Sequence, residues 1–245
     1  MDYSVLAKSY STLTYVKELR ELVASFYKTD KFNDLNKFEL AKKINNDVFK
    51  HYDGEQILKY KLASEFRNKK YVAAFEVKVK SSRADFLVIN GDTKSFEIKS
   101  KIDTLNRLEK QTCDYGDVFE YNTVVTDLKH LNKVVSTIPY YYGIWYYDGK
   151  TKVVVREALY SPNINSIEQL KMLTKKEIRT AFKTEEINQI IEEHSKETIN
   201  KIFKEILKKR YTIKWDFLTS NWNEILPIDI QFFFNKNIEP KLIYS

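Results

Sequence analysis

The sequence predicts an α/β fold in which a mixed central sheet is flanked by helices, with additional helical regions at both ends of the chain. Strand-like runs and helices alternate in the middle of the chain, while the flanks carry apolar residues at helical spacing. Gly and Pro are scarce, at five and four of 245 residues, which favours long regular elements. A hydrophobic content of 43% and an aromatic content of 14% are typical of a folded chain.

Three regions are expected along the chain. Residues 1–68 should form a helical region packed on the core, residues 69–160 the core that carries the sheet, and residues 161–245 a second helical region. Helices are predicted at 3–28, 37–51, 55–67, 103–118, 166–182 and 185–210, and strands at 71–79, 86–90, 94–100, 121–126, 141–147 and 152–156. The aromatic-rich tail, residues 212–240, is expected to pack back on the body.

Composition excludes several classes of protein. The single Cys113 excludes an intramolecular disulfide and indicates a reducing compartment. No leader-like or membrane-spanning apolar run is visible, so we expect a cytoplasmic protein with no membrane partner. The sequence lacks a GxxxxGK[ST] phosphate loop, and its three histidines show no metal-ligand spacing. A net charge of +7 suits a partner that carries phosphates, although a mixed Lys/Glu surface has the same composition.

The residues with a chemical signature lie in a predicted hairpin. Residues 86–90 and 94–100 have strand character, and Gly-Asp at 91–92 supplies the turn chemistry between them. A hairpin of this length brings Asp85 beside Glu97. Three E-x-K triplets occur in the chain, but only the one that begins at Glu97 has an Asp one hairpin upstream and a predicted helix directly after it.

Paired carboxylates beside an ammonium predict metal chemistry. Burying Asp85 next to Glu97 costs several kcal/mol unless a cation neutralises them, and a hard divalent ion with oxygen ligands is suited to this. Lys99 shares a face with Glu97 and would position water or stabilise charge that develops on phosphorus. The pattern therefore predicts metal-dependent hydrolysis of phosphodiesters with Mg²⁺ or Mn²⁺. The alternative is that these charges lie on the solvated face of an antiparallel sheet.

The flanking elements offer further candidates. Glu76 lies on the polar side of the strand at 71–79 and could face Asp85. Asp103 is a good N-cap for the next helix, and the four-residue spacing to Arg107, Gln111 and Tyr115 places these side chains on one row. Arg107 would contact a substrate phosphate or form an ion pair with Asp103.

At these residues the chain resembles the PD-(D/E)xK nuclease superfamily. Asp85, eleven intervening residues and Glu97-Ile98-Lys99 match its motif, with Ala84 in place of the usual Pro. Gln111 to Tyr115 is similar to the QxxxY motif of RecB-type nucleases. A poorly characterised bacterial and phage branch has a similar set, which is present here as Glu76, Arg83-Ala84-Asp85, Glu97-Ile98-Lys99-Ser100, Asp103-Thr104-Leu105, Arg107-Leu108, Gln111 and Tyr115.

The resemblance implies a restriction-endonuclease-like core at residues 69–160 and a role for each matched residue. It implies metal ligation by Asp85, Glu97, Glu76 and the carbonyl of Ile98, catalysis by the three acids with Lys99 and Gln111, and substrate contacts from Arg83, Ser100, Arg107 and Tyr115. Two alternatives stay open in this set: Arg83 would steady a phosphate or pair with a carboxylate, and Tyr115 would contact substrate or pack in the core with its hydroxyl tethered.

The implied activity is that of a magnesium-dependent deoxyribonuclease with DNA as its partner. The alternative is a non-cleaving subunit on a nuclease scaffold that binds nucleic acid or protein within a defence or recombination complex, because a fold does not determine a function. DNA versus RNA, endonuclease versus exonuclease action, sequence preference, and a homodimer versus another protein subunit stay open.

Overall fold

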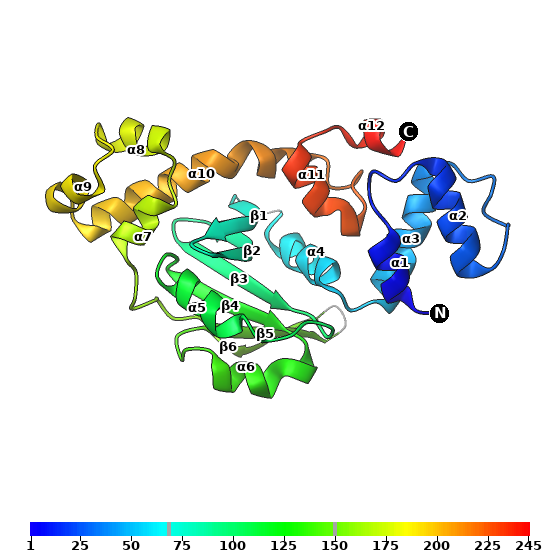
Figure 1. Ribbon diagram of the computed structural model, residues 1–245, viewed down its shortest axis with the longest axis horizontal. Helices are drawn as coiled ribbons and strands as arrows, with labels where there is room; N and C mark the ends of the chain where they lie inside the picture. The colour runs from blue at the N-terminus through cyan, green and yellow to red at the C-terminus, as the bar shows by residue number, and fades with distance from the viewer. Residues whose placement is uncertain (68–69, 149–150) are drawn as a thin grey trace.

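A mixed sheet organises the computed structural model, which describes residues 1–67, 70–148 and 151–245 (Figure 1). The six described strands lie in chain order: β1 (Val72–Val79), β2 (Ser82–Ile89), β3 (Thr93–Lys99), β4 (Tyr121–Thr126), β5 (Gly143–Asp148) and β6 (Thr151–Arg156). Strand β2 runs antiparallel to both β1 and β3. Strands β3, β4 and β5 are parallel, and β6 returns antiparallel to β5. The predicted α/β class is confirmed.

Connection lengths explain this mixture of strand directions. Tight turns join β1 to β2 and β2 to β3, whereas helical crossovers lie between β3 and β4 and between β4 and β5, as parallel neighbours require. The predicted turn before β3 is confirmed: Gly91 has a φ of 102°, a conformation that favours glycine. A second hairpin turn is predicted at Asp148-Gly149, and Gly149 lies outside the described residues.

Helices surround the sheet and extend beyond it. The described α-helices are α1 (Tyr3–Ser9), α2 (Val16–Tyr27), α3 (Lys37–His51), α4 (Glu55–Phe66), α5 (Leu108–Gly116), α6 (Leu131–Thr137), α7 (Ser166–Lys171), α8 (Lys175–Phe182), α9 (Ile187–Glu193), α10 (Lys196–Ser220), α11 (Ile230–Lys236) and α12 (Pro240–Tyr244). Two short 3₁₀ helices, η1 (Leu128–His130) and η2 (Pro227–Asp229), join some of them. No helix among the described residues combines the length and apolar character needed to cross a bilayer.

The two faces of the sheet pack on different helices. Phe86 and Phe96 join the large core cluster that contains Phe66 of α4 and Trp215 of α10. On the opposite face, Val124 of β4 lies in a cluster with Leu108 of α5 and Val134 of α6, whereas the next residue, Val125, belongs to the large cluster. This alternation is the period of two expected for a strand buried on both faces.

The N-terminal region divides into two parts. Helices α1–α3 share a separate apolar cluster that includes Leu6, Leu19 and Ile44, whereas α4 contributes Leu62 and Phe66 to the main core. Ile57, near the start of α4, lies in the cluster of α1–α3, so α4 joins the two clusters. The expected region boundary between residues 68 and 69 lies outside the described residues.

The C-terminal region completes the main core. Helices α10 and α11 pack on β1, and the aromatic tail returns to the body as expected (Figure 1). Helix α10 runs to Ser220 because Trp215 and Leu218 extend its buried stripe. The sequence-based end of this helix near residue 210 is therefore wrong. Lys208, Lys209 and Arg210 therefore lie in the interior of α10.

Three predicted helices are interrupted by residues that form caps or long-range hydrogen bonds. The predicted helix at 3–28 breaks between α1 and α2, where Tyr10 and Thr12 donate to the buried Asp229 at 2.9 and 2.8 Å. Thr174 is the N-cap of α8 and divides the helix predicted at 166–182. Ser195 is the N-cap of α10 and divides the helix predicted at 185–210. Hydroxyl side chains favour these cap positions over helix interiors.

Candidate active site

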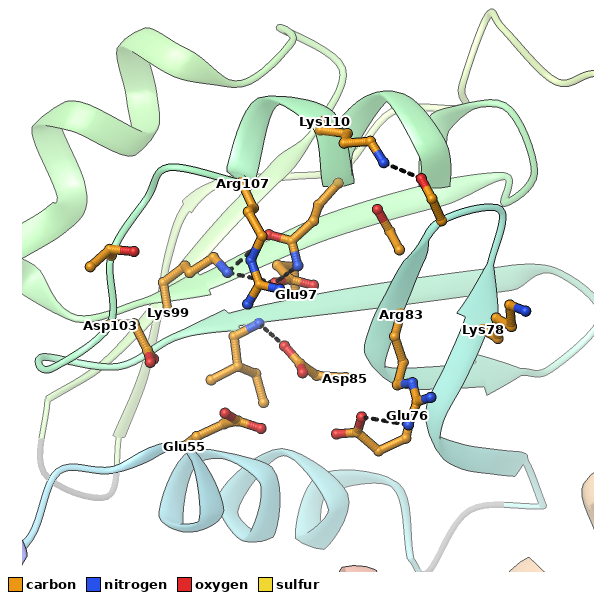
Figure 2. A pocket seen from close by; sticks show the side chains of 15 residues that line it. Glu55, Glu76, Lys78, Arg83, Asp85, Glu97, Lys99, Asp103, Arg107 and Lys110 are labelled. Carbon is orange, nitrogen blue, oxygen red and sulfur yellow. Dashed lines mark hydrogen bonds and ion pairs between the residues drawn. The ribbon is translucent and has the colours of Figure 1, made fainter.

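A polar pocket of about 550 Å³ opens between the N-terminal end of α4, the adjoining ends of β2 and β3, and α5 (Figure 2). Its lining is mostly charged: Glu55, Glu76, Lys78, Ser81, Ser82, Arg83, Asp85, Glu97, Ile98, Lys99, Asp103, Thr104, Arg107, Lys110 and Gln111. The pocket brings together residues from five elements: α4, the three consecutive strands β1, β2 and β3, and α5. It contains most of the residues that the sequence motif predicts.

Asp85 and Glu97 meet where β2 and β3 separate. The paired register of these strands ends at Phe86 opposite Phe96, and the next two residues are Asp85 and Glu97. The Asp85 carboxylate accepts a hydrogen bond from the backbone N–H of Ile98 at 2.6 Å. The carbonyl of Ile98 faces the same open edge, because both backbone groups of a strand residue point to one side. The hairpin prediction is confirmed.

Glu97 is held by an ordered set of donors and is only 2% exposed. The Lys99 ammonium lies 2.7 Å from Glu97 Oε1, the Gln111 amide donates to the same oxygen at 2.6 Å, and the Tyr115 hydroxyl lies 2.8 Å from Oε2. Lys99 also donates to Gln111 Oε1 at 3.0 Å. Because Glu97 and Lys99 are buried, the alternative of solvated surface charges is wrong for this pair.

Burial perturbs both central carboxyl groups. It raises the pKa of Asp85 well above its ordinary value; the neighbouring Glu97 raises it further, whereas Lys59 lowers it. Burial also raises the pKa of Glu97, although Lys99 and the hydrogen bond from Tyr115 act in the opposite direction. In this environment the charged forms of Asp85 and Glu97 are disfavoured. A cation bound beside them would stabilise both groups as carboxylates.

Glu76 occupies a special backbone position. Its φ of 55° lies in the left-handed region, which costs a non-glycine residue about 1–2 kcal/mol. Strand register places Glu76 opposite Asp85, between the paired positions Phe75–Phe86 and Val77–Ala84. Its carboxylate faces Asp85, as predicted, and a strained residue at this point is consistent with a functional constraint.

Two site residues on α4 were missed by sequence reasoning. Carboxylate oxygens of Glu55, Glu76 and Asp85 lie within 4.8 Å of one another, close enough to share a metal ion. The Lys59 ammonium contacts Glu76 and lies 2.5 Å from Glu55 and 3.8 Å from Asp85. Burial lowers the pKa of Lys59, but the three carboxylates outweigh burial and raise it above its ordinary value. The i,i+4 spacing of Glu55 and Lys59 was a visible signal, which is also that of an ordinary surface ion pair.

Exposed cations line one side of the pocket. Arg83 is 61% exposed at its side chain and lies 3.8 Å from Glu76, so it can pair with this carboxylate and still reach solvent. Lys78, Arg107 and Lys110 are also exposed and line the same pocket. In Figure 2 these side chains extend from the β1–β2 hairpin and from α5, opposite Glu55 on α4.

Asp103 and Ser100 have structural roles that differ from the prediction, and the structure distinguishes between the two alternatives for Tyr115. Asp103 does not cap α5, which begins at Leu108; it accepts hydrogen bonds from the backbone N–H and the hydroxyl of Ser100 at 2.7 and 2.6 Å. Ser100 and Tyr115 are fully buried and do not line the pocket, so the structure favours the packing role for Tyr115. The loop from Ser100 to Asp103 closes on itself and delays the start of the helix.

The donor set suits a hard divalent cation. Asp85, Glu76 and Glu55 offer converging carboxylate oxygens, and the Ile98 carbonyl borders the same pocket. Oxygen donors of this kind are the ligands that Mg²⁺ and Mn²⁺ prefer. Glu97 retains accepting capacity, because a carboxylate has about four lone-pair positions and three are occupied here.

Comparisons with known proteins assign a family. A search of curated proteins found no match. Among solved structures, the chain is similar to a protein of unknown function from Silicibacter pomeroyi, with 17% identity and a TM-score of 0.36, covering 56% of this chain and 92% of that chain. A family model described as bacteriophage P4 protein cII matches residues 46–233, which include every strand and all the pocket residues. This match spans well over half of the sequence, and the chain therefore belongs to the bacteriophage P4 protein cII family.

Proposed function

We propose that this protein is a metal-dependent nuclease that hydrolyses phosphodiester bonds of DNA. The observation that carries the proposal is the pairing of Asp85 and Glu97 at the point where β2 and β3 separate, with the Lys99 ammonium 2.7 Å from Glu97 in one polar pocket. Acids and an ammonium from neighbouring strands form an arrangement that can support metal-assisted hydrolysis of a phosphodiester. Such an enzyme would act on nucleic acid in the cytoplasm.

The residues of the pocket have separable roles in this proposal. Asp85, Glu76, Glu97 and the Ile98 carbonyl would hold Mg²⁺ or Mn²⁺. When bound, the ion would supply Lewis-acid polarisation of the phosphoryl oxygen and lower the pKa of water. Lys99 would orient the attacking water and stabilise charge on the phosphoryl oxygens.

Gln111 and Tyr115 would act on the position of Glu97. Gln111 contacts both Glu97 and Lys99, so it would hold the carboxylate and the ammonium at a fixed distance from each other. The Tyr115 hydroxyl lies near the second oxygen of Glu97. Partners that orient a metal-ligating carboxylate in this way commonly change metal affinity or activity 10- to 100-fold when removed.

The exposed cations on one side of the pocket support a polyanionic substrate. Arg83 and Arg107 would contact backbone phosphates, and Lys78 and Lys110 extend the positive edge. Arg can bind phosphate oxygens in a bidentate geometry, whereas Lys acts as a point charge. This edge would align the scissile bond over the acids.

A cleavage assay tests the proposal. Plasmid DNA, short DNA duplexes, single strands and matching RNA would be incubated with Mg²⁺, Mn²⁺ or EDTA. We expect divalent-ion-dependent cleavage of DNA, reduced at least about 100-fold in Glu97→Gln and in Lys99→Ala. Lys101→Ala, a change at an exposed neighbour, is the matched control and should keep wild-type cleavage. Equal cleavage by wild type and both site variants would contradict the proposed site.

A non-cleaving subunit on the same scaffold is the second candidate, and Lys59 is the observation that favours it. Its ammonium already contacts two of the three clustered carboxylates, Glu55 and Glu76, which partly neutralises them without a metal ion. Thermal unfolding in a magnesium titration separates the two candidates, because an ion that binds only the folded state raises the unfolding temperature. An unfolding temperature that does not change with magnesium would favour the non-cleaving subunit.

A further inference from the structure

Lys59 is a buried cation inside an acid cluster. It is 3% exposed, and its ammonium lies 2.5 Å from Glu55 and contacts Glu76. The side-chain amide oxygen of Gln231, from α11, accepts a further hydrogen bond from it at 2.8 Å. The side chain is therefore held from two directions, by helix α4 with β1 and by the C-terminal region.

The acids around Lys59 are the same acids that can share a metal ion. Glu55, Glu76 and Asp85 each place a carboxylate oxygen within 4.8 Å of the others, and the ammonium lies 3.8 Å from Asp85. Hydrolytic sites with two metal ions place the ions about 3.5–4 Å apart and bridge them with carboxylates. In this chain an ammonium lies among carboxylates that would otherwise be available to a second ion.

A charge count supports one divalent ion. The four acids Glu55, Glu76, Asp85 and Glu97 carry four negative charges, and the buried Lys59 and Lys99 carry two positive charges. Arg83, at the exposed edge, lies 3.8 Å from Glu76 and offsets this charge further. One divalent cation is therefore sufficient to neutralise the remaining negative charge. Buried charges are strongly disfavoured unless they are balanced, so a second divalent ion would leave an excess positive charge in the pocket.

We propose that Lys59 acts as a resident cation that restricts this site to one divalent metal ion. The inference rests on the proposed metal-dependent function and goes beyond it, because it specifies the number of ions and the residue that sets this number. Lys59 is a positioning residue in this scheme: it holds Glu55 and Glu76 and does not touch the reacting phosphate.

The test counts bound Mn²⁺ ions in the absence of nucleic acid, by calorimetric titration and by electron paramagnetic resonance of free Mn²⁺. We expect one ion per chain for wild type and a second, more weakly bound ion for Lys59→Met. Removing the ammonium opens its place among the Glu55, Glu76 and Asp85 carboxylates and makes the charge left by the first ion more negative by one. The double variant Glu55→Gln/Lys59→Met restores the net charge of minus two and should bind one ion. Lys50→Met, at an exposed position on α3, is the control and should bind one ion.

The outcomes separate this inference from the function on which it rests. Two ions in wild type, or one ion in folded Lys59→Met, overturn the role of Lys59 and leave a metal-dependent nuclease intact. No ion bound by wild type contradicts the proposed function itself. If Lys59→Met does not fold, Lys59→Gln, which is uncharged but keeps a hydrogen-bonding head group, repeats the count: a second ion supports the role of Lys59, and a single ion overturns it.

Discussion

Tyr115 contributes to the candidate site without reaching its surface. It is fully buried, and its hydroxyl lies 2.8 Å from a Glu97 oxygen and 2.7 Å from the carbonyl of Arg83. The hydroxyl therefore links the acid of β3 to the backbone of β2 at the point where the two strands separate. In the proposed reaction, Tyr115 would therefore act only through the acid that it holds.

Tyr115→Phe should lower both stability and metal affinity. Removing a hydroxyl beside a buried carboxylate leaves an acceptor without its partner, which costs about 1–3 kcal/mol of unfolding free energy. Metal binding should weaken on the order of 10- to 100-fold. Urea unfolding and Mn²⁺ titration measure the two effects. Tyr140→Phe, at a side chain that is 71% exposed, should change neither quantity, and equal behaviour of the two variants would contradict the role of Tyr115.

The sequence-based interpretation succeeded best for residues whose positions depend on local pattern. Asp85 meets Glu97 because a period of two and a glycine turn at Gly91 determine which residues of a hairpin face each other. Lys59 was missed because its spacing from Glu55 is equally typical of a surface ion pair. Only the packing of α4 on the sheet reveals that this lysine is buried among acids.

At the scale of elements, Asp229 joins segments from both ends of the chain. It lies at the junction of η2 and α11 and is 1% exposed. Hydroxyls of Tyr10 and Thr12, from the segment after α1, and of Tyr244 in α12 donate to its carboxylate at 2.8–2.9 Å. The break in the predicted N-terminal helix follows from this contact, because Tyr10 and Thr12 must leave the helix path to reach Asp229.

Asp229→Ala should destabilise the protein by about 3 kcal/mol, because three buried hydroxyls lose a charged acceptor. Urea unfolding of the full chain measures the change. Asp216→Ala, at an exposed position on α10, is the matched control and should shift the unfolding free energy by less than about 0.5 kcal/mol. A similarly small effect of Asp229→Ala would show that the two ends of the chain are held by apolar packing alone.

At the scale of the whole molecule, buried carboxyl groups give stability a defined pH dependence. Burial raises the pKa of Asp229 above its ordinary value of 3.8, although its hydroxyl donors oppose the shift. The folded state therefore binds this proton more readily than the unfolded state. The contribution of the protonated Asp229 carboxyl group to the unfolding free energy is fully present below pH 3.8. It is lost as the pH rises through the higher pKa that this group has in the folded protein.

A comparison of wild type with Asp229→Asn isolates this dependence. Asparagine keeps the shape and an accepting oxygen but does not titrate. The unfolding free energy of wild type relative to the variant should therefore fall as the pH rises from about 4, over the window set by the raised pKa. Urea unfolding between pH 4 and 7 measures the difference. A difference that rises with pH would contradict the direction of the shift.

The sequence by itself determined the local features of this protein: the α/β class, the hairpin of β2 and β3, and the pairing of Asp85 with Glu97 and Lys99. These follow from residue periodicity and turn chemistry, which act over a few positions. Only the tertiary structure decided where the long helices break, that α4 joins the two core clusters, and that Lys59 lies among Glu55, Glu76 and Asp85. The physical reason is that burial and ion pairing between distant segments depend on how elements pack, and local sequence patterns do not encode that packing.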